Sequence, residues 1–293
     1  MAEWRESPSF RAGGDVNWRY VEAPDAGAPL PRRLLGVWRH RRLWRRMAER
    51  DLRQRYVGSA LGLAWTALSP LLFVAVYVSI FTFVFGARLS PGAPTVEYAL
   101  YVLSGLLPWV AFSDVAGRAT QTMAEHRNLV KYAVFPVQIL PLTSLYAVSF
   151  SQGIGLVLVL LLSAWVNGGL PVTLWLLPLV LLLQILFLAG VAWLLGALGA
   201  ILRDVKEVVQ LTLMVGMFLT PIFYLEQSLP PPLRLVLELN PLTHLVRLYR
   251  GVVLGPELWH PASLPVFALI AVATLLAGFL AFERTRTFLS DIL

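Results

Sequence analysis

One stretch of the chain, residues 132–202, reads YAVFPVQILPLTSLYAVSFSQGIGLVLVLLLSAWVNGGLPVTLWLLPLVLLLQILFLAGVAWLLGALGAIL and contains no Asp, Glu, Lys or Arg over 71 residues. A helix needs about 20 apolar residues to cross the hydrocarbon core of a bilayer. The stretch is therefore long enough for two crossings. The segment Asn167-Gly168-Gly169-Leu170-Pro171 lies near its middle and favours a turn. We expect two membrane-spanning helices, at about 138–165 and 172–201.

Uncharged runs on either side of this stretch indicate four more spans. No charged residue lies between Arg55 and Arg88, for example. Continuous Leu, Val and Ala runs favour helices, because the strands of a membrane barrel would alternate apolar and polar residues. We therefore expect an all-α integral membrane protein with six transmembrane helices. The four additional spans are predicted at about 63–85, 98–117, 208–225 and 262–282.

Charge content and charge placement both support a membrane protein with its two ends in the cytoplasm. Charged residues make up 14% of the 293 residues, against about 25% in a typical soluble domain. With both ends inside, all but four of the 24 Lys and Arg residues fall on the inner side, as the positive-inside rule requires. This placement explains the net charge of +7 without a nucleic-acid partner. The four exceptions are Arg88, Arg234, Arg247 and Arg250.

The region before the first span divides into a tail and an arginine-rich helix. Residues 1–31 are rich in Pro, Gly, Ala and acidic residues, which predicts a flexible tail. Residues 32–56 predict an amphipathic helix on the cytoplasmic leaflet. Its arginines either anchor the topology by snorkelling or also bind the phosphate of a lipid substrate. Those on one helical face are Arg39, Arg42, Arg46, Arg50 and Arg53.

Two connecting segments are not simple loops. Residues 118–136 are too polar to cross the membrane and form either a solvated connector or a docking helix for a cytoplasmic partner. Residues 226–261 lie outside and hold two apolar pieces that are too short to span. They form either an interfacial loop or a re-entrant helical hairpin between spans 5 and 6. The candidate hairpin residues are Asn240, Pro241, Arg247 and Arg250.

The motifs of common enzyme classes are missing from the chain. It has no cysteine, neither lysine follows a glycine as a P-loop requires, and no His-Glu-x-x-His or Gly-x-Ser-x-Gly occurs. The sequence therefore predicts no metal site, no cofactor and no ATP hydrolysis in this chain. A membrane-bound transferase is a further alternative. It would need clustered carboxylates or histidines, and the spacing of the outer acidic and histidine residues does not single out a site.

Four stretches, in order, resemble the permease subunits of ABC exporters for cell-surface polysaccharides. This family comprises the O-antigen, teichoic-acid and capsule exporters (Wzm/TagG type, ABC-2 permeases). The resemblance covers the chain from about residue 45 to its end. The stretches are Arg50–Tyr56 with Gly58–Trp65, Ser104–Trp109, Asn128–Lys131 with Phe135 and Pro136, and Asn240–Thr243.

The resemblance implies an ABC-2 transmembrane domain over residues 57–293, in the bacterial inner membrane. It implies a homodimer with two copies of a separate ATPase that binds ATP and Mg, and a polysaccharide cargo on an undecaprenyl-linked lipid. A drug or lipid permease of the same superfamily is the alternative. It also implies an ATPase coupling helix comprising Gln121, Glu125, Arg127, Asn128, Leu129, Val130 and Lys131.

Aromatic residues in two spans suit a sugar polymer. The resemblance implies that spans 1 and 5 line a channel at the dimer interface. Span 1 places three aromatic residues four apart, on one helical face, and the C–H faces of sugars stack on such rings. Ordinary lipid-facing or helix-packing aromatics are the alternative. The candidate lining residues are Phe73, Tyr77, Phe81, Met214, Phe218 and Tyr224.

Overall fold

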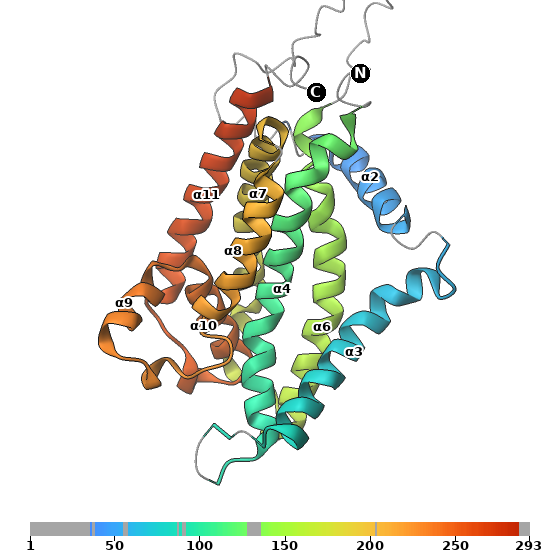
Figure 1. The fold of residues 1–293 in the computed structure, drawn as a ribbon. Helices are drawn as coiled ribbons and strands as arrows, with labels where there is room; N and C mark the ends of the chain where they lie inside the picture. The colour runs from blue at the N-terminus through green and yellow to red at the C-terminus, as the bar shows by residue number, and fades with distance from the viewer. Residues whose placement is uncertain are drawn as a thin grey trace, which may run out of the picture.

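The computed structural model describes residue 36 and residues 39–54, 58–86, 88–89, 92–127, 136–202 and 204–286. Every regular element within these ranges is helical, as predicted (Figure 1). The predicted tail, residues 1–31, lies outside the described residues, and so does the part of the predicted coupling helix from Asn128 to Lys131.

Five helical segments of the described chain are long and apolar enough to cross a membrane, and they overlap five of the six predicted spans. The second is longer than predicted: residues 118–125, expected to belong to a connecting segment or a docking helix, continue the same helix to Glu125. The sixth prediction, 208–225, is wrong in length. Helix α8 (Val205–Leu219) has 15 residues and is about 22 Å long, whereas the hydrocarbon core is about 30 Å thick. The helix ends because Thr220 precedes Pro221 and adopts the extended conformation that residues before proline favour. The five segments are Trp65–Val84, Thr95–Glu125, Val137–Asn167, Val172–Ile201 and Ser263–Arg286.

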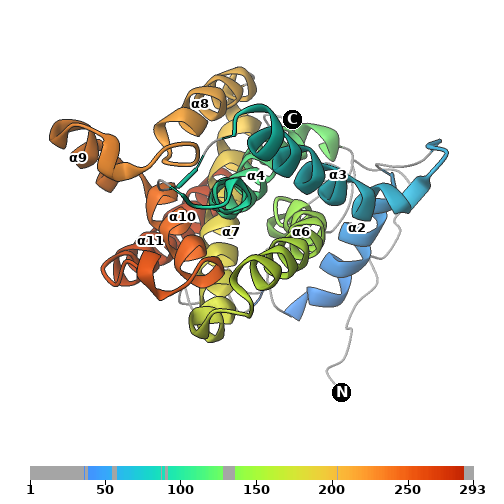
Figure 2. The ribbon, with the colours of Figure 1, turned by 90° about the horizontal axis from the view of Figure 1, so that it is seen from below.

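The centre of the bundle is formed by four long helices (Figures 1 and 2). Helices α7 and α11 cross so closely that a Cβ added to Gly278 would lie 2.0 Å from the carbonyl oxygen of Gly190. Small residues permit this backbone approach in a membrane, where apolar burial alone does not drive helix association. The four helices are α4 (Thr95–Glu125), α6 (Thr143–Asn167), α7 (Leu177–Ile201) and α11 (Ser263–Arg286).

Two N-terminal helices lie outside this centre. Helix α2 (Arg41–Gln54) packs on the beginning of α6, where the indole Nε1 of Trp44 donates to the carbonyl of Leu142 at 2.9 Å. Helix α3 (Trp65–Ser79), continued by a π-helical turn η2 (Ile80–Val84), runs obliquely along the bundle (Figure 1). The end that carries α2 and the last turns of α4 and α11 is called the inner end below.

Two helices near the outer end follow α8. Helix α9 (Pro231–Leu239) projects sideways (Figure 2) and buries only Leu237. Helix α10 (Pro241–Val253) is buried along almost its whole length and lies below α8 in Figure 1. The remaining short helices are η1 (Gly62–Ala64), η3 (Val137–Ile139), η4 (Val172–Leu176), η5 (Glu226–Ser228) and η6 (Pro256–Leu258).

Candidate functional site

The predicted aromatic residues of span 1 form part of a longer row of rings. The ring centroids of Phe73 and Tyr77 are 4.6 Å apart, and those of Tyr77 and Phe81 are 6.1 Å apart. All three side chains are half-buried. The ring centroid of Phe223 is 6.4 Å from that of Phe81 and 6.3 Å from that of Phe218. The row therefore connects α3 to α8, and we call these five residues the aromatic row.

Phe223 was missed by the sequence analysis, although it directly precedes the predicted residue Tyr224. Its position in the turn after α8 gives no helical periodicity, so only the fold brings it between Phe81 and Phe218. Tyr224 donates its hydroxyl to the carbonyl of Phe218 at 3.1 Å. This bond helps to fix the end of α8.

Helix α8 presents an uncovered apolar surface beside the aromatic row. None of its 15 residues is buried. Of the two predicted lining residues on this helix, Met214 is 60% exposed and Phe218 is 63% exposed. An apolar surface of this kind needs lipid or a second protein to cover it. The other large hydrophobic residues more than half exposed on this helix are Val208, Leu211, Val215 and Leu219.

Arg247 connects three elements of the outer hairpin through two carboxylates. Its guanidinium donates to Glu226 of η5 at 2.5 Å and to Glu238 of α9 at 2.6 Å. Burial alone would lower the pKa of Arg247, but the hydrogen bonds with the two carboxylates outweigh burial and raise it. The same contact lowers the pKa of Glu238. The predicted hairpin residue is therefore a permanent cation that holds η5 and α9 against α10.

Arg250 is more deeply buried, with 3% of its surface exposed. Its guanidinium donates to the carbonyls of Pro221 and Ile222, the latter at 3.1 Å, and lies 3.6 Å from the ring centre of Tyr101. Burial lowers the pKa of Arg250 to about 10, so the group stays charged at neutral pH. It gives a donor to two carbonyls of the turn that follows α8. Tyr101 was not among the predicted residues.

Asn240 and Pro241 begin α10 at the same turn. The side-chain oxygen of Asn240 accepts from the backbone N–H of Leu242, which makes it the N-cap. Its amide nitrogen donates to Thr220 Oγ1 at 3.0 Å. Pro241 occupies the first helical turn, where a missing N–H costs little. The four predicted hairpin residues thus gather around the turn between α8 and α9.

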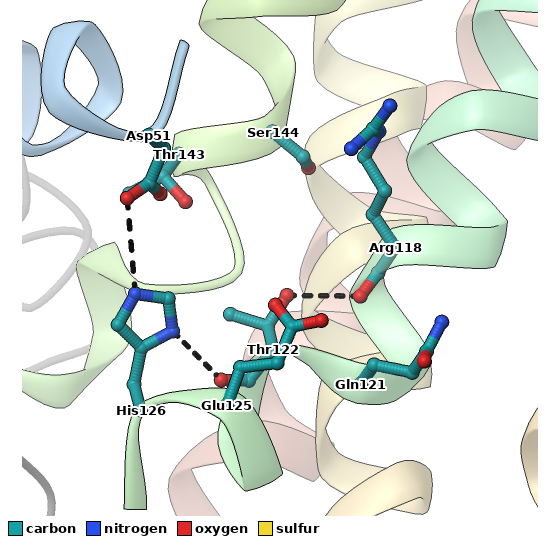
Figure 3. Close-up of a pocket in the computed structure, with 8 residues that line it drawn as sticks. All are labelled: Asp51, Arg118, Gln121, Thr122, Glu125, His126, Thr143 and Ser144. Carbon is teal, nitrogen blue, oxygen red and sulfur yellow. Dashed lines mark hydrogen bonds and ion pairs between the residues drawn. The ribbon is translucent and has the colours of Figure 1, made fainter. Parts of the chain in front are cut away.

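The inner end holds a polar cavity of about 390 Å³ between α2, α4 and α6 (Figure 3). Two residues of the predicted coupling helix, Gln121 and Glu125, line it on α4. His126 Nε2 lies 3.8 Å from Asp51 Oδ1 on α2, and this contact raises the pKa of His126. The remaining lining residues are Arg118, Thr122, Thr143 and Ser144.

The other predicted inner residues lie on the surface. Arg127 is exposed next to the end of α4. The face of α2 around Trp44, Met47 and Ala48 is covered by the bundle, and the arginine face points away from it. The predicted interface arginines, all exposed, are Arg39, Arg42, Arg46, Arg50 and Arg53.

Comparison with known families and proteins agrees with this arrangement. The profile of the family described as ABC-2 type transporter matches residues 42–254, from α2 to the end of α10. The chain belongs to this family. The resemblance inferred from the four sequence stretches is thereby confirmed, and the permease is the membrane component of a transporter and not an enzyme.

Relatives of this permease include named exporters from three bacteria. The O-antigen export system permease protein RfbA of Myxococcus xanthus is 31% identical over 256 residues, which cover 85% of this chain and 95% of the relative. A protein of the same name from Klebsiella pneumoniae is 27% identical over 72% of this chain and 80% of its own. The polysialic acid transport protein KpsM of Escherichia coli is 25% identical over 81% of this chain and 90% of its own.

Proposed function

We propose that this permease exports a lipid-linked cell-surface polysaccharide across the bacterial inner membrane. The names of its relatives refer to O-antigen export and polysialic acid transport, which supports a polymeric sugar as cargo and an inner-membrane location. The observation that carries the proposal is the aromatic row, which runs from α3 to the uncovered helix α8.

The channel forms between two copies of the permease. Within one chain, α8 and much of α3 lack a protein cover: only Thr66 and Pro70 of α3 are buried. In a homodimer, two such surfaces face each other and enclose a path lined with aromatic rings. Aromatic rings bind the C–H faces of sugars only weakly at each position, so a repeating polymer can slide along them.

The chain crosses the membrane six times, with both ends in the cytoplasm. Helix α7 ends at the inner end and α11 begins near the outer end. The chain must therefore return to the outer side between them, and α8 provides most of this crossing. Helices α9 and α10 then form the re-entrant hairpin; α10 is buried in protein, as membrane depth demands, whereas α9 buries only Leu237.

Energy comes from two copies of a cytoplasmic ABC ATPase that hold the ATP and Mg. Gln121, Glu125 and Arg127 lie at the inner end of α4, where a cytoplasmic subunit can reach them. The proposed coupling segment also includes Asn128, Leu129, Val130 and Lys131, which lie outside the described residues. Deleting these four residues should abolish export and stimulated ATP turnover while the permease still inserts. Normal export by the deletion variant would refute the coupling role.

The exposed arginines on α2 and just before it contact lipid phosphate at the inner leaflet. Because Trp44 fixes the opposite face of α2 on α6, the guanidinium groups are held toward the headgroup region. Arginine suits phosphate because its planar guanidinium offers paired donors. The proposed contacts are Arg39, Arg42, Arg46, Arg50 and Arg53.

The cargo is tested with the permease and its ATPase in vesicles that contain lipid-linked polysaccharide. Changing Tyr77, Phe81 or Phe218 to Ala should reduce polymer export strongly and leave the amount of assembled complex unchanged. Phe150, 52% exposed on α6, is the matched control, and Phe150→Ala should export normally. Equal export by all four variants would contradict the aromatic path. ATP-driven movement of a drug or ordinary lipid, without polymer export, would favour the alternative permease class.

A further inference from the structure

The inner cavity between α2, α4 and α6 has properties that the export path does not explain. It measures about 390 Å³ and lies between α2 and the ends of α4 and α6. Its eight lining residues are all polar or charged. Most are drawn in Figure 3 with their polar ends toward a shared space. A cavity with this lining favours a polar ligand whose charges are opposite to those of the lining residues.

The charges of the cavity are separated along α4. Arg118 and Glu125 are seven residues apart, which is about 10 Å along a helix. Figure 3 shows Arg118 on one side of the space and the pair of Asp51 and His126 on the other. Among the described residues, neither Arg118 nor Glu125 makes an ion pair. A ligand with one anionic and one cationic group would pair with both.

The order of these charges matches the depth of a phospholipid headgroup. Counted from Thr95 at the start of α4, Arg118 lies about 34 Å along the helix, just past a hydrocarbon core of about 30 Å. Glu125 lies about 10 Å farther toward the cytoplasm, which is comparable to the length of a phospholipid headgroup. The phosphate of a phospholipid sits nearest the hydrocarbon and the amine extends beyond it. Arg118 is thus at phosphate depth and Glu125 is at amine depth.

Hydrogen bonding restricts the amine. The hydroxyls of Thr122, Thr143 and Ser144 already donate to the carbonyls of Arg118, Leu140 and Pro141 at 3.0, 2.9 and 3.1 Å. A hydroxyl has one hydrogen to donate and two lone pairs to accept, so these oxygens face the cavity as acceptors. Together with Asp51 and Glu125 they form an acceptor-rich wall. A primary ammonium has three N–H donors for it, whereas the trimethylammonium of choline has none.

We propose that this cavity binds the headgroup of an inner-leaflet ethanolamine phospholipid. The phosphate pairs with Arg118, and the ammonium binds Asp51, Glu125 and the threonine and serine oxygens. The bound lipid joins α2 to the end of α4, next to the segment proposed to couple to the ATPase. The lipid is a resident ligand and not cargo, so the site stands even if the exported polymer is a different one.

Native mass spectrometry of the full-length permease with defined lipids tests the site. With matched acyl chains, wild type should retain phosphatidylethanolamine about tenfold more than phosphatidylcholine, since each lost N–H contact to a carboxylate weakens binding. The mono- and dimethyl derivatives should fall between them in order of remaining N–H groups. Equal retention across the series, or stronger retention of phosphatidylglycerol, would overturn the proposal. This measurement needs no variant, so it cannot fail through misfolding.

Variants then test which side chains of the cavity bind the lipid headgroup. Arg118→Gln with Glu125→Gln should remove the preference for ethanolamine, and both positions are exposed, so the fold should persist. Arg127→Gln is the matched control, because Arg127 is exposed beside the cavity without lining it. Retained preference in the double variant would overturn the site. Soluble glycerophosphoethanolamine at equal concentration should not replace the lipid, and equal binding of both would exclude a membrane source.

Discussion

Helices α8 and α10, which are separated in the chain by η5 and α9, are opposites in composition and burial. Helix α8 is mostly apolar, and none of its 15 residues is buried. Helix α10 carries His244, Arg247, Tyr249 and Arg250, and 12 of its 13 residues are buried. In water the reverse would be expected. In a membrane the apolar helix can face lipid or a second subunit, while polar groups must find partners inside the protein.

The partners of α10 explain why its burial is tolerated. Tyr249 donates to Gln184 on α7 and accepts from Gln152 on α6 at 2.7 Å. His244 pairs with Ser263 Oγ at 3.3 Å and with the carbonyl of Glu238 at 3.0 Å. These bonds join α10 to α6, α7, α9 and α11. The difference from α8 is therefore testable: substitutions in α10 should unfold the permease, and those in α8 should impair only its transport.

The largest effect on stability is expected from Arg250→Met. The change leaves the buried carbonyls of Pro221 and Ile222 without their donor, and losing one partner of a buried charged contact costs about 3–5 kcal/mol. The free energy of unfolding, measured by titration with denaturing detergent, should fall by that amount. Arg234→Met is the control, since Arg234 is exposed on α9. Equal stability of the two variants would show that the buried guanidinium does not hold the turn.

A smaller loss is expected when one carboxylate of the Arg247 pair is neutralised. Glu226 is 19% exposed and Glu238 is 49% exposed at the side chain. Glu226→Gln should therefore destabilise by about 1–3 kcal/mol, and Glu238→Gln by less than about 1 kcal/mol, because water screens the second contact. The same detergent titration compares them. A larger effect at Glu238 would reverse our ranking of the two contacts.

Acid should weaken the same hairpin. The hydrogen bond from Arg247 lowers the pKa of Glu238 from its usual 4.5. Its contribution to stability is therefore present above pH 4.5 and is lost as the pH falls through the lowered pKa. The hydrogen-exchange protection of α9, corrected for the intrinsic exchange rate at each pH, should fall in this window in wild type. In Glu238→Gln the loss of protection should be smaller, and an identical loss in both would remove Glu238 as its cause.

A weaker effect of opposite sign is expected at the inner end. The contact with Asp51 raises the pKa of His126, so the pair stabilises the α2–α4 junction fully below the ordinary histidine pKa of about 6.5. The stabilisation is lost as the pH rises through the raised pKa. We expect less than about 1 kcal/mol, visible as lower hydrogen-exchange protection of α2 as the pH rises, after correction for the intrinsic exchange rate at each pH. In His126→Gln the protection of α2 should not change over that pH range.

The smallest effect on stability is expected on α8. Met214→Ala and Leu211→Ala remove side chains that are 60% and 63% exposed, so no packed contact within one chain is lost. The free energy of unfolding should stay within about 0.5 kcal/mol of wild type. Export should fall nonetheless, because the same surface is proposed to line the channel. Destabilisation as large as that of Arg250→Met would mean that α8 packs inside a single chain.

For the outer hairpin, the sequence predicted two short helical pieces separated by a break at Asn240 and Pro241, and it placed Arg247 and Arg250 among four basic residues on the outer side. It could not predict that Arg250 lies against Tyr101, or that Glu226 and Glu238 both reach Arg247. These partners are 9 to 149 positions apart in the chain, and no local periodicity relates them.

The sequence by itself determined the helical class and five of the spans, because hydrophobic length acts locally along the chain. Only the tertiary structure decided which helices are buried. Apolar side chains suit both lipid and protein interiors, so hydropathy cannot distinguish α4 from α8. The tertiary structure also decided where α8 ends and which rings meet at Phe223, since a buried arginine and three separate segments fix that turn together.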